Sequence, residues 1–199
     1  MTSQVEVCNM AMGFIGSQAR IADINETSQE AFYCRVYWDY SRKMVLAEAA
    51  WHFANKRLAL ADLGLSTADW SYSYTYPADC IRFLGIANPI NSGLASTRIP
   101  FEVGINEAKT SKIIWTDYAA ATGIYTADIT APGLWSVGFP KALAARLAWE
   151  IAMPLTGDEK IAQLAARIAA VELSKASAQD ANEEYMSQDW TADYQEARN

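Results

Sequence analysis

One histidine limits the hydrolytic chemistry that this 199-residue sequence can support. A Ser–His or Cys–His nucleophile would need His52 as its base, because a hydroxyl or thiol without a base is a weak nucleophile near neutral pH. The possible partners are Cys8, Cys34, Cys80 and serines that no motif marks. His52 stands between Trp51 and Phe53, so a role in the core or at a helix end is the simpler interpretation.

Metal and phosphate sites lack their usual motifs. A zinc site needs several His or Cys ligands, and the three cysteines form no Cys-x-x-Cys pair. The stretch GFIGSQAR at 13–20 lacks the Lys of a phosphate-binding loop, so we interpret it as a helix end and a turn. The sequence therefore predicts no metal and no cofactor.

Two pairs of carboxylates, Asp23 with Glu26 and Asp158 with Glu159, could act as acid and base. Acidic residues are also common at helix N-termini, where the helix dipole favours negative charge. We favour this structural role. The sequence predicts no catalytic residue, and we expect a protein that is not an enzyme.

Composition and charge narrow the possible partners. Hydrophobic residues make up 51% of the chain and charged residues 20%, as in an ordinary globular protein. The net charge of −7 disfavours tight binding to phosphate backbones. No apolar run approaches the roughly 18 residues of a membrane span, and the N-terminus does not resemble a signal peptide. We expect a chain made in the cytoplasm that binds no membrane, with reduced, mostly buried cysteines.

Capping signals and apolar spacing predict four helices. They cover about 4–15, 28–50, 140–153 and 158–186. Three capping boxes are expected, at Ser3 and Glu6, Thr27 and Glu30, and Thr156 and Glu159. Gly16 is expected to end the first helix in the left-handed conformation, and Pro154 with Gly157 to end the third.

The two longer helices carry apolar repeats at helical spacing. The repeat of the second helix comprises Tyr33, Tyr37, Tyr40, Met44, Ala47 and Trp51. The repeat of the last helix comprises Ile161, Leu164, Ile168 and Val171. The simplest interpretation places both repeats in the core, and a seam between subunits is the alternative for the second helix.

The middle of the chain changes character. Short extended runs are expected at 81–87, 99–104, 112–118 and 122–129, with a turn at 91–93 and a further strand after residue 52. We predict an α+β fold that is predominantly helical, in which both chain ends form one helical bundle around an inserted small antiparallel β subdomain. The expected parts are a helical segment at 1–63, a β-rich insertion at 64–138, helices of the same bundle at 139–187 and an acidic tail at 188–199.

An aromatic ridge precedes the first of these runs. Alternation in a strand puts Trp70, Tyr72, Tyr74 and Tyr76 on one side. The ridge is either a core wall or a contact surface, and the intervening Ser and Thr residues favour the contact surface.

Several segments, taken in order, resemble one family. They are GFIGSQARIADINETSQEA after the first helix, W-x-F-A at 51–54, YPADCIR at 76–82 and PLTGD at 154–158. Their order and spacing are similar to those of the tail tubular protein A family of short-tailed bacteriophages, whose members are head-to-tail adaptors. The resemblance spans nearly the whole chain, and none of these segments is a catalytic motif.

The resemblance implies a structural virion protein of the phage neck. Such adaptors form a ring, commonly a dodecamer, between the portal protein and the tail nozzle, a protein of the tail tubular protein B type. DNA passes through the ring without specific binding, and an acidic channel would repel it. Position in the chain suggests Tyr185, Trp190 and Tyr194 as portal contacts, and the ridge at 70–76 as a subunit or nozzle contact.

Two other functions stay open at this point. Another neck protein, such as a tail-completion or stopper protein, would have the same structural character. A small virion-associated hydrolase that uses His52 or a carboxylate pair is the competitor from a different class.

Overall fold

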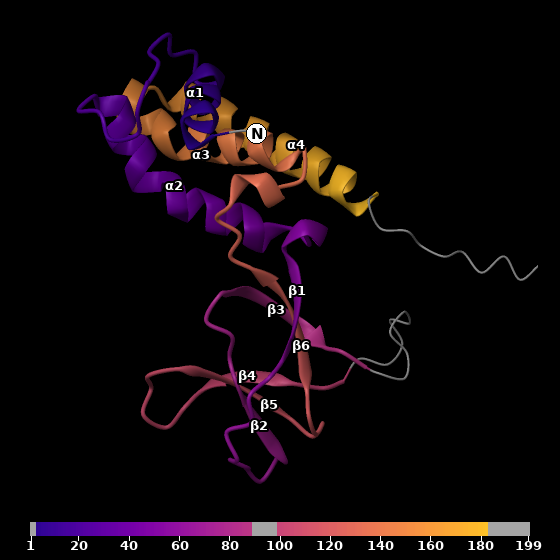
Figure 1. The fold of residues 1–199 in the computed structure, drawn as a ribbon. Coiled ribbons are helices and arrows are strands. Elements are labelled where there is room, and N and C mark those ends of the chain that lie inside the picture. Colours follow the sequence, from indigo (N-terminus) through magenta and orange to yellow (C-terminus); the bar gives the residue numbers. More distant parts are fainter. Residues whose placement is uncertain (1–2, 89–98, 183–199) are drawn as a thin grey trace, which may run out of the picture.

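A computed structural model of the chain describes residues 3–88 and 99–182. It confirms the predicted α+β class. The helices form one structural part and the strands form the other. The helices are α1 (Gln4–Phe14), α2 (Gln29–Glu48), α3 (Phe139–Thr156) and α4 (Glu159–Ala181). The strands are β1 (Asn55–Ala59), β2 (Tyr72–Thr75), β3 (Cys80–Ile86), β4 (Glu102–Ile105), β5 (Lys112–Thr116) and β6 (Thr122–Ala127). Short 3₁₀ helices at His52–Ala54 and Pro132–Leu134 lie on the two connections between the parts (Figure 1).

Local signals set some helix ends as predicted. Ser3 and Glu6 form the expected capping box, with the Ser3 N–H donating to Glu6 Oε2 at 2.7 Å and the Glu6 N–H donating to Ser3 Oγ at 3.2 Å. Gly16 has φ +73° and Gly157 has φ +63°, a conformation that glycine adopts without strain. Both glycines therefore end helices as expected.

Other predicted helix ends are wrong. The N-cap of α2 is Ser28 in place of Thr27, and its hydroxyl accepts from the Ala31 N–H at 3.3 Å. The N-cap of α4 is Asp158 in place of Thr156. Thr156 is instead the last residue of α3, and its hydroxyl donates to the Ala152 carbonyl at 2.7 Å.

Pro154 also does not stop α3. The helix continues through Pro154 to Thr156. Proline has no backbone N–H, so Pro154 removes one hydrogen bond of the helix. Because Pro154 lies in the last turn, this loss affects only the end of α3. The helix ends where Gly157 takes the left-handed conformation.

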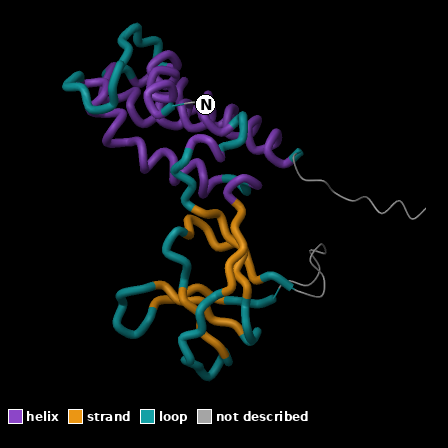
Figure 2. Tube along the Cα trace, in the orientation of Figure 1, coloured by secondary structure: helices purple, strands orange, loops and turns teal. Residues whose placement is uncertain are grey.

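The strands form two antiparallel sheets of three, where we expected one small sheet. Their orders are β1–β6–β3 and β2–β5–β4. Strand β1 begins at Asn55, inside the range assigned to the N-terminal helical part. The predicted turn at 91–93 lies outside the described residues. In Figure 2 the helices gather at one end of the molecule and the strands at the other.

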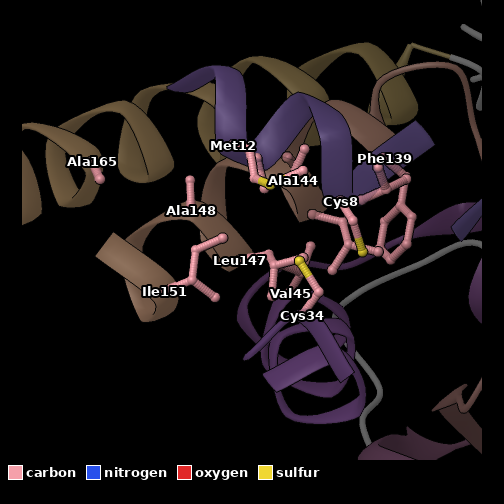
Figure 3. Close-up of a cluster of buried hydrophobic side chains, with 14 of the residues drawn as sticks. Cys8, Met12, Cys34, Val45, Phe139, Ala144, Leu147, Ala148, Ile151 and Ala165 are labelled. Atoms are coloured by element: carbon pink, nitrogen blue, oxygen red, sulfur yellow. The ribbon is translucent and has the colours of Figure 1, made fainter. Parts of the chain in front are cut away.

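The larger core lies among the helices, with α3 at its centre. Helix α3 packs against α1, α2 and α4, and most of its side chains are buried. In Figure 3, α4 and α2 lie on opposite sides of the region that α1 and α3 occupy. Trp51 closes the core near the connection, where its indole N–H donates to the Val45 carbonyl at 2.7 Å and its ring meets Phe139 edge-on at 5.1 Å. A smaller core fills the space between the sheets, around Tyr74 and Ile114.

Two contacts made by charged side chains lie at the boundary between the helical part and the part formed by the strands. Arg42 of α2 is 2% exposed and contacts Asp128, which directly follows β6. Asp180, near the end of α4, accepts a hydrogen bond from the backbone N–H of His52. Helix α2, the exit from β6 and the end of α4 therefore meet near the two connections.

Candidate interaction surfaces

His52, the one possible imidazole base, contacts Asp180. Its Nδ1 lies 3.2 Å from Asp180 Oδ2 and 3.1 Å from the Asp180 carbonyl oxygen. The Asp180 side chain is fully buried, so this contact fixes the end of α4 against the 3₁₀ helix at His52–Ala54. The interpretation of His52 as a residue at a helix end agrees with this position.

The cysteines occupy protected positions. Cys8 and Cys34 are buried neighbours in the helical core, and Cys80 is half-buried (Figure 3). The contact with the Cys34 thiol, together with burial, holds the pKa of Cys8 well above its usual value. Burial likewise raises the pKa of Cys80, whose thiol donates to the Tyr76 hydroxyl at 3.2 Å. Cys8 and Cys80 are therefore protonated at neutral pH, and a protonated thiol is a poor nucleophile.

The candidate carboxylates make local structural contacts. Glu26 accepts from the Ser28 hydroxyl at 2.6 Å, and this hydrogen bond is the main reason that the pKa of Glu26 lies below its usual value. Asp158 accepts from the Lys160 N–H at 2.8 Å as the N-cap of α4. These contacts match the structural role that the sequence favoured for the two pairs.

The aromatic ridge is in part a core wall. Tyr74 is 1% exposed, and its hydroxyl donates to the Tyr118 carbonyl at 2.9 Å, so the expectation of a contact surface is wrong for this ring. Ser73 is also buried, because both faces of β2 are covered. Tyr72 stacks on Tyr74 at 6.5 Å, and the Trp70 indole donates to Glu102 at 3.1 Å.

Trp70, Tyr72 and Tyr76 keep part of their surface exposed. Tyr76 packs on Phe83 with ring centroids 6.2 Å apart. A contact role for these three rings stays a prediction. The proposed portal contacts Tyr185, Trp190 and Tyr194 lie outside the described residues.

The predicted repeat of α2 is confirmed in part. Trp51 is buried in the helical core, and Tyr33 and Tyr37 pack against it half-buried, but Tyr40 is 49% exposed. The fully buried positions of the helix are Ala31, Cys34, Ser41, Arg42, Val45 and Leu46. Trp38 of the same helix meets the Trp135 ring at 6.5 Å.

Helix α2 carries a half-exposed apolar stripe, in which Tyr40 has the Arg146 guanidinium 5.9 Å from its ring centroid. Phe32, Val36 and Tyr40 are between 49% and 54% exposed and follow one another at intervals of four residues. This spacing aligns them in one row along the helix. We call this row the α2 stripe. Sequence reasoning missed Phe32 and Val36, although their spacing was visible.

Helix α4 shows an inversion of its predicted repeat. Alanines face its core side, namely Ala165, Ala169 and Ala176. Of the predicted repeat, Leu164 is 54% exposed, Val171 is 50% exposed and Ile168 is half-buried. We call these three residues the α4 stripe. The residues predicted for the core therefore lie largely on the outside of this helix.

An apolar groove lies between the two outer helices. Its cavity has a volume of about 300 Å³, and its floor and walls come from α2, α3 and α4. Arg146 is 8% exposed there, pairs with Glu48 at 2.7 Å and lies 4.4 Å from the Trp149 ring centroid. Its charge is therefore already satisfied by protein groups.

No family model matches the chain, and no curated protein matches it. The function must therefore be argued from the molecule itself.

Within residues 3–88 and 99–182, no cluster of three or more His, Cys, Asp or Glu side chains is placed to hold a metal ion. None of the helices in these ranges has the length and hydropathy that crossing a bilayer requires.

Proposed function

We propose that this chain is a structural head-to-tail adaptor of a short-tailed phage, which forms a ring between the portal protein and the tail nozzle. The observation that carries the proposal is the pair of half-exposed apolar stripes on α2 and α4, two outer helices on different sides of the bundle. Apolar rows of this kind mark contacts with other proteins. Two different contact patches on one subunit are what a ring of identical copies needs.

The geometry of the titratable residues is in keeping with a structural role. His52 ties down the end of α4, and the Asp158 carboxylate caps the same helix at its start. An adaptor needs a rigid body with contact surfaces and no reacting group. The net charge of −7 per copy gives an assembled ring a strongly acidic character, which suits a channel that DNA crosses without sticking.

The test is reconstitution with the portal protein encoded in the same genome. We expect native mass spectrometry of the mixture to show a portal carrying a full ring of this chain. A portal that gains no copies would refute the adaptor function. A complex with a stoichiometry different from that of a complete ring would point to another protein of the neck.

A further inference from the structure

Cys8 of α1 and Cys34 of α2 are a pair of buried thiols that the proposed function does not use. Both residues are 0% exposed and belong to the helical core. In Figure 3 their side chains extend from the two helices into the space between them. The thiols lie within hydrogen-bonding reach of each other, with Cys8 as the donor. The fold thus brings together two cysteines that are 26 positions apart in the sequence.

Core packing alone does not require this contact. A single cysteine in a core behaves as a small apolar side chain, and it needs no second thiol beside it. Cys80 has such a position, because its thiol donates to the Tyr76 hydroxyl at 3.2 Å. Cys8 and Cys34 differ from Cys80 in that each has another thiol as its neighbour. A disulfide requires two thiols that point toward each other, and this pair meets that condition.

The contact also makes the two thiols unequal in reactivity. The hydrogen bond from Cys8 lowers the pKa of Cys34 below its usual value. The contact with Cys34, together with burial, raises the pKa of Cys8. The thiolate is the nucleophilic form of cysteine, so Cys34 is the sulfur that reacts first with an oxidant. Cys8 is then the thiol that completes the bond.

We propose that Cys8 and Cys34 form a redox-controlled disulfide that locks α1 onto α2. Thiols stay reduced in a cytoplasm, so the pair is open when the chain is made there and closes under oxidising conditions. The oxidant is a small peroxide, because only a molecule close to water in size fits beside two fully buried sulfurs. Helix α1 has 11 residues and packs on α3, so a local opening of this one short helix admits the oxidant. The lock is independent of the adaptor function.

The reaction has two steps that balance. The Cys34 sulfur attacks one oxygen of hydrogen peroxide, the O–O bond breaks, and the other oxygen leaves as water with the thiol proton, so that Cys34 becomes a sulfenic acid. The Cys8 sulfur then attacks the Cys34 sulfur, the S–O bond breaks, and the hydroxyl leaves as a second water with the Cys8 proton. The two thiols lose two electrons and two protons, and the peroxide gains them.

Peptide mapping can identify this disulfide without ambiguity. Trypsin cleaves after Arg20 and Arg35, so it places Cys8 and Cys34 in separate peptides. Cys80→Ala removes the third thiol of the chain and serves as the reference protein. Cys34→Ala and Cys8→Ala, each added to Cys80→Ala, are the matched controls, because each keeps only one thiol of the pair.

The folded reference protein is treated with one equivalent of hydrogen peroxide and compared with the same protein in dithiothreitol. We expect the two tryptic peptides to be linked and both thiols to disappear. Closing a loop of this length should raise Tm by about 5–10 °C, and dithiothreitol should reverse the rise. The single-thiol controls should show no linked peptide and no rise in Tm. One control that is folded by circular dichroism is enough for this comparison.

Three results would overturn the lock. Peptides that become linked only after the chain is unfolded in urea would show that the folded core does not form the bond. A bond that forms in the folded protein but lowers Tm would show that the helices are forced out of position, so that the disulfide is not a lock. An equal rise in Tm for a folded single-thiol control would assign the effect of peroxide to another residue.

Discussion

Replacement of Arg42 by methionine should weaken the joint between the two structural parts. The guanidinium is 2% exposed and donates to Asp128, to the Ile129 carbonyl at 3.3 Å and to Asp39 at 3.2 Å. Methionine retains the apolar stem and its packing but supplies neither charge nor donors. The variant Arg42→Met therefore leaves Asp128 and the Ile129 carbonyl without these donors.

The expected loss follows from burial. Removing one member of a buried ion pair costs about 3–5 kcal/mol, because the remaining charge stays desolvated. The Asp128 side chain is 23% exposed and Asp39 is 74% exposed, so water can reach both carboxylates. We therefore expect a loss of about 2–3 kcal/mol in the free energy of unfolding. For a chain of this length, that loss lowers Tm by about 4–12 °C.

Urea and thermal unfolding followed by circular dichroism measure this effect. Lys43→Met is the control, because Lys43 is the exposed neighbour of Arg42 and its replacement should change stability by less than about 0.5 kcal/mol. The double variant Arg42→Met with Asp128→Asn should recover part of the loss, since a neutral amide is less costly to leave without a cation. A single variant as stable as the wild type, or a double variant no better than the single one, would refute the reasoning.

Two further predictions concern carboxylates that act in the fold. Asp180→Ala should lower the free energy of unfolding by about 1–3 kcal/mol, because the part-buried backbone N–H of His52 loses its acceptor. Asp180→Asn keeps an acceptor oxygen and should lower the free energy of unfolding by less. Urea denaturation measures both changes. The hydrogen bond from Lys56 at 2.7 Å, followed by that from Tyr125 at 2.8 Å, holds the pKa of Asp79 below its usual value of 3.8. The stability that this carboxylate adds is therefore present above about pH 4 and is lost as pH falls through the lowered pKa. The unfolding free energies of the wild type and Asp79→Asn should therefore converge below that pH. A difference between the two unfolding free energies that stays constant across this range would contradict the assignment.

Sequence reasoning succeeded where a local signal acts alone. The capping box of Ser3 and Glu6 and the left-handed Gly16 depend on a few adjacent residues, and both were predicted. The four later strands were also found, because their runs of β-branched and aromatic residues are bounded by turn residues. The α+β class follows from these elements.

Sequence reasoning failed where tertiary packing decides the outcome. Alternation around Tyr74 predicted one apolar side, but Ser73 is buried as well, and its hydroxyl accepts from the Leu65 N–H at 3.0 Å. Spacing alone cannot show that both faces of a short strand are covered, because a small serine fits a tight site as well as an exposed one. The same limit applies to the division into two sheets, which depends on pairings between strands that are far apart in sequence.

The inverted face of α4 follows from how closely α3 and α4 approach. A side-chain carbon added to Gly138, at the start of α3, would lie 3.0 Å from the Ala176 Cα atom, so the backbones are nearly in contact there. A leucine or valine in place of Ala176 would overfill the space there and cost about 1–3 kcal/mol. Farther along the two helices, Ala142 of α3 and Ala166, Ala169 and Ala170 of α4 line the groove described above.

The fully buried apolar positions of α4 are alanines, whereas Leu164 and Val171 are about half exposed on its outer side. Outward apolar residues contribute little to the stability of the isolated chain, because water still reaches about half of their surface. They become stabilising only when another surface covers them. The close approach of α3 and α4 at Gly138 and Ala176 therefore accounts for alanine at that inward position, and leaves Leu164 and Val171 available to a partner surface.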